Sequence, residues 1–293
     1  VAGSAQAAEM SVSGSASMSY NGQDNNTLGN GWTMTDSVTF AASGEMDNGL
    51  SVALTLELDG NVMDTRTIAL TTDGLGTITF SGDGASGPIG SWDDVTPTAN
   101  EEAHGSTLAG TMAGATNAAG TNDIFVYDYT LMDGLALKAS YVPSHTTGAV
   151  DGSLDYGVNY TGIDGLSVHL AMGENNDVAN AADVSMMSVK YTAGAISVGY
   201  QVNETDFGTG TADEDFTAVG VSYAISDDLS VSFNSSTIDY EATANDDQEA
   251  TAVSFSHTSG GMTISGSYGS MDNVAGTSTA DNSAYEINFK FAF

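Results

Sequence analysis

The sequence predicts an all-β chain that forms a 16-stranded antiparallel transmembrane β-barrel. Apolar and polar residues alternate with a period of two from Met10 to Phe293, which is typical of strands with one apolar face. Short and long polar connections alternate between these strands. No run approaches the ~18 consecutive apolar residues of a membrane-spanning helix. Because lipid offers the backbone no hydrogen-bond partners, a sheet that crosses it must close on itself.

The alternation is clearest in the segments 50–58, 154–160 and 285–293. In 50–58 (LSVALTLEL), four leucines and one valine share one face, while Ser, Ala, Thr and Glu occupy the other. Aromatic residues lie near the strand ends on the apolar face, as in the aromatic girdles of membrane barrels: Tyr20, Tyr141, Tyr160, Tyr191, Tyr200, Tyr223 and Tyr268. A soluble sandwich would also alternate, but the small polar face here lacks the lysines that usually protect a soluble sheet.

The connections give the strand count. Seven short turns rich in Gly and Asp are expected at 47–49, 73–76, 132–134, 162–165, 193–195, 226–228 and 259–261. Eight longer polar loops are expected at 21–32, 59–64, 83–122, 143–152, 173–182, 203–215, 235–249 and 269–282. Fifteen connections join sixteen strands and leave both termini on the short-turn side. Outer-membrane barrels have this asymmetry, with short periplasmic turns and long extracellular loops.

The first residues suggest processing. Ala5-Gln6-Ala7 resembles the end of a secretory signal, with cleavage before Ala8. We therefore interpret residues 1–7 as a signal-peptide remnant and 8–293 as a single transmembrane barrel domain.

The charge balance restricts the partners. The chain has 38 Asp and Glu against 4 Lys and Arg, a formal net charge of −34. Nucleic acid is excluded as a partner because both molecules are anionic. The charge favours cations as partners or permeants, and the alternative interpretation is a solvated acidic surface. The absence of cysteine rules out thiol chemistry and Cys-bound metals.

Several segments together carry a family resemblance. The turn and strand at 74–80 (GLGTITF) are followed directly by the long segment 83–122, and the chain ends in the strand EINFKFAF at 286–293. Turn-plus-strand units recur at 47–54 and 132–142, and again at 162–172. From about Glu9 onward the chain resembles a general diffusion porin of the alphaproteobacterial type. Each motif alone is weak, but the fifteen ordered connections strengthen the resemblance.

The resemblance implies a homotrimer of water-filled barrels in the Gram-negative outer membrane, exported through the periplasm. It implies contact with outer-membrane lipid and lipopolysaccharide. The third long loop, 83–122, would fold into the lumen as the pore constriction. The terminal Phe293 would be the signal read by the barrel-assembly machinery.

The same resemblance places the acidic side of the constriction at Asp93, Asp94, Glu101 and Glu102, and a basic cluster on the opposite wall. By strand parity Lys138, Lys190 and Lys290 point into the lumen near the periplasmic ends, whereas Arg66 points outwards. Lys290 could pair with Glu286 or with an acid of the first strand. No arginine cluster can be built from these residues. We therefore expect a net-negative lumen that passes small hydrophilic solutes and ions by passive diffusion and prefers cations.

Other functions have weaker support. No HExxH, GxSxG or Walker motif occurs, so no catalytic residues are assigned and no enzyme is expected. The histidines His104, His145, His169 and His257 are scattered and predict no metal site. Weak candidates for loop-bound Ca²⁺ or Mg²⁺ are Asp213, Glu214, Asp215, Asp246 and Asp247, with solvated acids as the favoured alternative. The competing function is a structural or surface-array barrel bridged by divalent cations. Small residues of early strands would suit barrel–barrel contact: Gly14, Ala16, Ala41 and Ala42.

Overall fold

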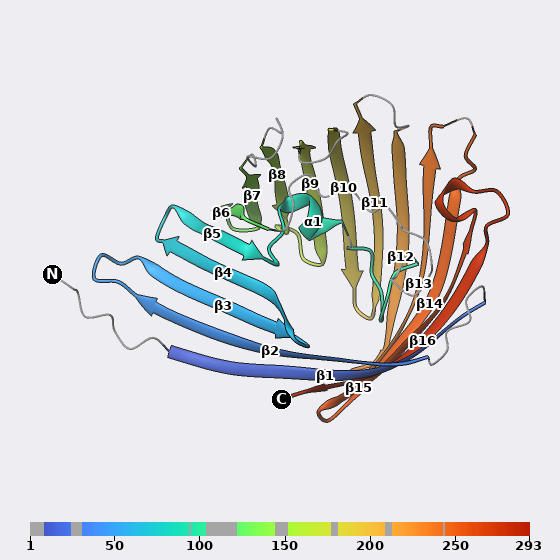
Figure 1. Cartoon of the computed structure of the whole chain (residues 1–293), viewed down its shortest axis with the longest axis horizontal. Helices are drawn as coiled ribbons and strands as arrows, with labels where there is room; N and C mark the ends of the chain where they lie inside the picture. The colour runs from blue at the N-terminus through green and yellow to red at the C-terminus, as the bar shows by residue number, and fades with distance from the viewer. Residues whose placement is uncertain are drawn as a thin grey trace.

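The chain forms one closed antiparallel barrel of sixteen strands in the computed structural model (Figure 1). The structure describes residues 9–24, 31–93, 95–103, 122–143, 152–176, 181–208, 213–242 and 244–293. Each strand pairs with its sequence neighbours, and β1 pairs with β16 to close the ring. The predicted fold class and strand count are therefore confirmed. Residues 1–7, interpreted as a signal remnant, lie outside the described part of the chain.

The strand bounds are β1 Glu9–Gln23, β2 Trp32–Glu45, β3 Ser51–Asp59, β4 Val62–Thr72, β5 Gly76–Asp83, β6 Ile124–Met132, β7 Leu135–Val142, β8 Ser153–Tyr160, β9 Leu166–Asn175, β10 Ala182–Ala193, β11 Ile196–Phe207, β12 Glu214–Ser226, β13 Leu229–Tyr240, β14 Gln248–Ser259, β15 Met262–Asp272 and β16 Asn282–Ala292. Two short helices accompany them, α1 Pro88–Trp92 and the 3₁₀ turn η1 Val274–Gly276. No helix among these residues is long and apolar enough to cross a membrane.

The seven predicted short turns all join consecutive strands. One predicted loop, 59–64, is wrong: β3 continues to Asp59 and β4 begins at Val62, so the connection is the tight turn Gly60-Asn61. Gly60 has φ +58°, which its missing Cβ permits. The polar residues of 59–64 suggested a loop. The hydrogen bonds between paired strands, however, join backbone groups and therefore do not require apolar side chains. For the same reason β11, β12 and β13 extend into the predicted loops 203–215 and 235–249.

The two faces of the wall differ as the alternation predicts. Large apolar side chains of the outer face are exposed, with Met34 71% and Val198 47% accessible. The predicted girdle tyrosines at 141, 160, 191, 200, 223 and 268 are all exposed on this face. The inner face carries buried polar residues such as Ser188 and Gln201. This arrangement places the apolar surface against lipid and the polar surface around the lumen.

The C-terminal residue completes the closure. Gly14 and Phe293 exchange two backbone hydrogen bonds, N···O 2.8 and 3.0 Å, just beyond the end of β16. A Cβ on Gly14 would lie 2.9 Å from the Phe293 ring, so the glycine leaves room for the ring on the outer face. The terminal aromatic residue is thus part of the seam between first and last strands.

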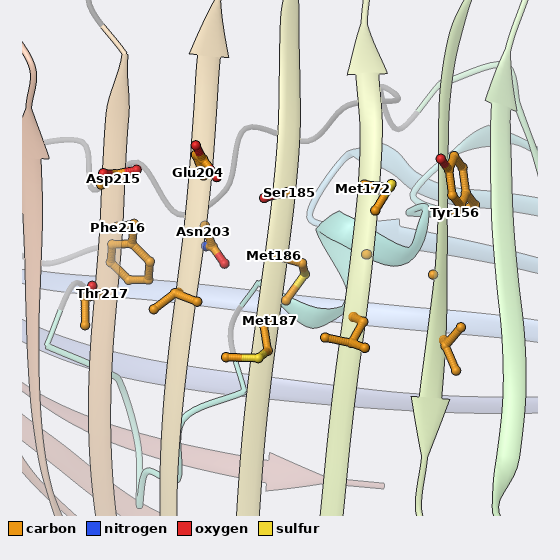
Figure 2. Close-up of a pocket in the computed structure, with 15 residues that line it drawn as sticks. Tyr156, Met172, Ser185, Met186, Met187, Asn203, Glu204, Asp215, Phe216 and Thr217 are labelled. Carbon is orange, nitrogen blue, oxygen red and sulfur yellow. The ribbon is translucent and has the colours of Figure 1, made fainter.

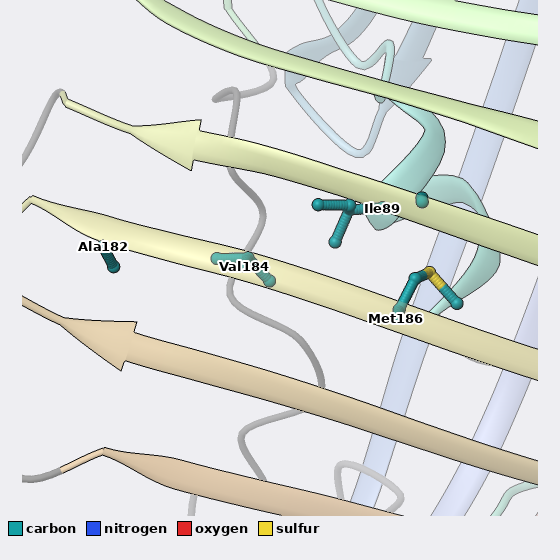
Figure 3. Packing of buried hydrophobic residues seen from close by; sticks show 5 residues of the cluster. Ile89, Ala182, Val184 and Met186 are labelled. Atoms are coloured by element: carbon teal, nitrogen blue, oxygen red, sulfur yellow. The ribbon is translucent and has the colours of Figure 1, made fainter.

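The inner face is less uniformly polar than predicted. Buried apolar patches occur on the inner sides of β9–β10, β6–β7 and β14–β16. Each of these patches receives residues of the segment that follows β5: Ile89 and Trp92 on β9–β10, Ala85 on β6–β7, and Ala103 on β14–β16. Figure 3 shows Ile89 beside Val184 and Met186 of β10. These patches interrupt the polar lumen because they hold that segment.

Candidate pore constriction

The described part of the segment after β5, residues 84–93 and 95–103, lies against the inner wall. Its helix α1 contacts β7, β8, β9 and β10, and Figure 1 shows it within the ring of strands. Residues further along the segment reach β11, β13, β14 and β16, as the hydrogen bonds below show. The segment therefore follows the inside of the barrel from one side to the other.

A buried carboxylate holds the start of α1. The N-cap residue Gly87 offers no side-chain cap, but Asp155 of β8 supplies an acceptor: its Oδ2 receives the Ile89 N–H at 3.3 Å. The Ser140 hydroxyl donates to the other carboxylate oxygen. Asp155 and Ile89 are both fully buried. A Cβ on Gly87 would lie 2.2 to 2.4 Å from these side-chain oxygens, so only glycine allows this close approach.

The end of α1 is held by packing and by one further hydrogen bond. The Trp92 ring stacks on His169 of β9, with centroids 4.9 Å apart and planes at 29°. The His169 Nδ1 lies 2.9 Å from the Ser188 hydroxyl, which fixes the imidazole under the indole. Lys138 of β7 donates from Nζ to the Ser91 hydroxyl at 2.7 Å. The stacking of Trp92 on His169 and the hydrogen bond from Lys138 to Ser91 therefore both hold α1 against the wall.

Beyond α1 the segment is held through its backbone. Gln201 of β11 donates from Nε2 to the Asp93 carbonyl at 2.5 Å and accepts from the Val95 N–H at 3.5 Å. Asn234 of β13 donates to the Pro97 carbonyl at 3.1 Å. Because side-chain amides satisfy these backbone groups, the segment needs no strand partner of its own.

The last described stretch crosses to β16. The Ala99 N–H donates to the Ser232 hydroxyl at 2.9 Å, and the Asn100 N–H donates to the Ser254 hydroxyl at 3.1 Å. The Asn100 side chain then donates to Glu286 Oε1 at 2.7 Å. Ala103 is buried in the apolar patch of β14–β16.

The structure describes three of the four predicted constriction acids. Asp93 is the C-cap residue of α1, and Glu101 and Glu102 are half-buried beyond the hydrogen-bonded stretch. Asp94 lies outside the described residues. Glu101 and Asn100 border a cavity of about 460 Å³ whose other walls are the inner faces of β1, β15 and β16. This cavity lies in the lumen beside the segment.

The lysines occupy inward positions of their strands, and Arg66 occupies an outward one. Lys138 and Lys190 share strand parity with the inward Ser140 and Ser188, and Lys290 lines the 460 Å³ cavity. Arg66 is exposed on the outer face and donates to the Gly82 carbonyl at 3.2 Å.

The suggested pairing of Lys290 with Glu286 is not what the structure has. The Glu286 Oε1 instead accepts from Asn100 and, at 2.9 Å, from Asn288. Lys290 lies four positions beyond Glu286 along an extended strand, so their Cα atoms are about 13 Å apart.

The wall of β1–β5, across the lumen from α1, is lined with hydroxyls. The Ser15 and Ser37 hydroxyls lie 3.2 Å apart, and those of Thr71 and Thr77 lie 2.8 Å apart. No Lys or Arg of these five strands faces the lumen, since Arg66 points outwards. We call the inner faces of β1–β5 the hydroxyl wall. It stands where the family resemblance implied a basic cluster.

Sequence reasoning missed Asp155, Gln201 and Asn234, which hold the segment. In the sequence each of them is an amide or an acid at a polar strand position. Many other lumen residues have the same property, so it does not single out these three. Apolar patches left a better signal, because β10 carries apolar residues of both parities at Val184, Met186 and Met187. A strand that is apolar on both faces inside a polar lumen indicates a docking point.

A larger depression, about 670 Å³, lies on the other side of the wall. Its exposed lining includes Tyr156, Met172 and Met187 of β8, β9 and β10. Figure 2 shows Asp215, Glu204 and Ser185 of β12, β11 and β10 level with Met172 and Tyr156, and Met187 below them. This depression faces lipid and is no part of the pore.

The weak divalent-cation candidates do not converge. Glu214 and Asp215 are successive residues of β12 and point to opposite faces. The Asp213 side chain accepts the Phe207 N–H at 2.9 Å. Across the described ranges no group of three or more His, Asp or Glu residues is arranged to hold a metal ion.

The closed barrel, its apolar belt and its internal segment define the class of membrane-spanning channel barrels. The model of one family, the Gram-negative porins, matches residues 1–293. The chain belongs to the Gram-negative porin family and is a protein of the outer membrane. Porins are channels rather than enzymes. A search among curated proteins finds no match.

Solved structures share the fold. An anion-selective porin from Comamonas acidovorans has TM-score 0.78 and 15% identity, covering 98% of this chain and 100% of that one. The in-vitro folded OmpT of Vibrio cholerae has TM-score 0.74 and 15% identity, covering 98% of each chain. A mutant of Rh. blastica porin has TM-score 0.69 and 15% identity, covering 97% and 100%. At this identity the likeness concerns the fold alone.

Proposed function

We propose that the protein lets small hydrophilic solutes and ions diffuse passively through its lumen and that it prefers cations. The observation that carries this proposal is the hydroxyl wall. Glu101 of the internal segment borders a cavity with Ser17 and Ser19 of this wall, and no Lys or Arg of β1–β5 faces the lumen to attract anions. Selectivity in such a pore depends on its width and on the charges that line it.

The charges of the inner face support a negative lumen. Besides Glu101 and Glu286, the inward-facing acids include Glu57 and Asp128. Two of the three inward lysines, Lys138 and Lys190, belong to the strands that hold the segment. Lys138 lies opposite Asp128 in the strand register. A low-dielectric wall around acidic side chains concentrates counter-ions, which here are cations.

We assign the narrow part of the pore to the segment 83–122, with Asp93, Asp94, Glu101 and Glu102 on its acidic side. The hydrogen bonds of residues 89–100 to the wall support this assignment because they hold the segment across the lumen. Glu101 has the strongest support, since it borders the 460 Å³ cavity.

We further propose a homotrimer embedded in outer-membrane lipid and lipopolysaccharide. One structural relative, OmpT of Vibrio cholerae, was solved in a trimer form. Gly14, Ala16 and Ala42 share the outward parity of β1 and β2 and would allow close contact, whereas Ala41 has inward parity and would not. Phe293, exposed to 78% at the seam, is accessible to the barrel-assembly machinery as a C-terminal signal.

The role of the segment acids is testable with the double variant Glu101→Gln, Glu102→Gln in planar bilayers. We expect an open channel of similar conductance at 1 M KCl and a clearly smaller cation preference at 0.1 M KCl, where charges are less screened. Glu249→Gln removes an acid from the outer face and should change neither quantity. An equal loss of selectivity in both variants would contradict the assignment.

A surface array bridged by divalent cations is less favoured, because family membership points to a channel. An array would give no stable open steps, and its assemblies would dissolve when EDTA is added.

A further inference from the structure

The 460 Å³ cavity lies between the internal segment and the inner faces of β1, β15 and β16, and a binding role for it rests on the proposed pore function. A cavity of this size can hold a small solute. Its walls are polar throughout, with hydroxyls, amides, two carboxylates and one ammonium group.

The strand register orders the charges along the pore axis. Lys290 lies level with Ser17 and Thr263. Glu286 lies four residues away on the same face of β16, level with Asn21. The cavity thus has an ammonium group at one end and a carboxylate at the other.

The two charges do not neutralise each other. Their Cα atoms are about 13 Å apart, and both side chains point out of the sheet into the lumen rather than along the strand. The hydrogen bonds to Glu286 come from the neutral amides of Asn100 and Asn288, at 2.7 and 2.9 Å, and both reach the same oxygen, Oε1. The residues level with Lys290 are Ser17 and Thr263, whose hydroxyls carry no charge.

The groups between these ends suit hydrogen bonding. Ser19 and Ser265 lie level with Asn288, between the two charges. The Asn21 Oδ1 beside Glu286 is buried and accepts no hydrogen bond. A buried acceptor without a donor is costly, and a ligand N–H would satisfy it.

We propose that this cavity binds the zwitterionic form of an amino acid or short peptide. The ligand ammonium lies at Glu286 and Glu101, and its carboxylate lies at Lys290. A dipeptide fits well, because its terminal charges are separated by several ångströms and its amide can bond to the hydroxyls between. Two charge-assisted contacts in opposite directions also select against simple cations and anions, which satisfy only one end.

The test uses the full-length protein in planar bilayers, with diglycine as the probe and the neutral amide N-acetylglycinamide as its size-matched comparison. We expect diglycine to interrupt the ion current and N-acetylglycinamide to do so at least tenfold more weakly. Glu286→Gln and Lys290→Gln should each weaken the diglycine block by about tenfold or more. Lys290→Arg should keep it, and so should Glu249→Gln on the outer face.

Three results would overturn the inference. Diglycine and N-acetylglycinamide could block equally, which would indicate size alone. Methylammonium could block as well as diglycine in a way that depends on Glu286 but not on Lys290, which would indicate a cation site. The block could also persist in both Gln variants. Failure of the proposed pore function is distinct, because it would appear as a missing open-channel current before any probe is added.

Discussion

At the scale of single residues, Asp155 does more than line the lumen. It is fully buried, receives a backbone N–H of α1 and is bonded by Ser140. Its carboxyl group also lies at the N-terminal end of the helix, where unsatisfied N–H groups need an acceptor. Gly87 makes the approach possible. These residues together fix where the internal segment leaves β5 and begins to cross the pore.

Asp155→Ala should therefore loosen the segment without opening the barrel. The substitution leaves the buried Ile89 N–H without its acceptor, which costs about 1–3 kcal/mol, and here that loss falls on the docking of α1. We expect larger open-channel current fluctuations, measured in single-channel recordings, with the heat-dependent gel shift of the folded barrel preserved.

Asp128→Ala is the matched control, since Asp128 is an inward acid of β6 that makes no hydrogen bond to the segment residues 84–93 and 95–103 that the structure describes. Current noise as low in Asp155→Ala as in Asp128→Ala would contradict the role of Asp155.

At the scale of strands, the outer face of β9–β15 carries an acidic belt. Its carboxylates stand directly opposite one another in neighbouring strands: Glu174–Asp183–Asp206, Glu204–Asp215–Asp239 and Glu249–Asp272. No Lys or Arg of these strands faces outwards in the described residues, because Lys190 points into the lumen. Like charges directly opposite destabilise a sheet, so the belt weakens the pairing near the extracellular rim.

Asp183→Asn should relieve this repulsion, since Asp183 has a carboxylate opposite it on both sides. We expect a gain of about 0.2–1 kcal/mol per pair, seen as a higher unfolding temperature at 10 mM salt and a much smaller gain at 1 M, where the Debye length is about 3 Å. Asp36→Asn is the control, because Asp36 on the outer face of β2 stands opposite Ala16. A gain that is independent of salt, or equal in both variants, would contradict the account.

Strands and contacts differ in how far the sequence predicts them. Sixteen strands and the long segment after the fifth follow from period-two alternation, which lipid on one side and water on the other impose on every strand. The turn Gly60-Asn61 was missed because above the membrane both faces meet water and the alternation disappears. Contacts such as Asn100 with Glu286 were not predictable, since they join residues 186 apart in sequence and depend on the path of one segment.

At the scale of the whole molecule, the barrel is a wall with two different inner halves. One half holds the internal segment through buried side chains from β7 to β16. The other half, the hydroxyl wall, carries serine and threonine where a basic cluster would be needed to balance the acids. With a formal net charge of −34, the molecule has few cations for such a balance. The expected transverse field across the pore is therefore weak and the lumen negative.

The most direct test of this account is the zero-current potential of the protein in a planar bilayer under a tenfold KCl gradient. A negative lumen without a basic wall predicts a potential of the sign set by potassium, larger with a 0.01–0.1 M gradient than with a 0.1–1 M gradient because salt screens the lining charges. A potential of the sign set by chloride, at either pair of concentrations, would contradict it.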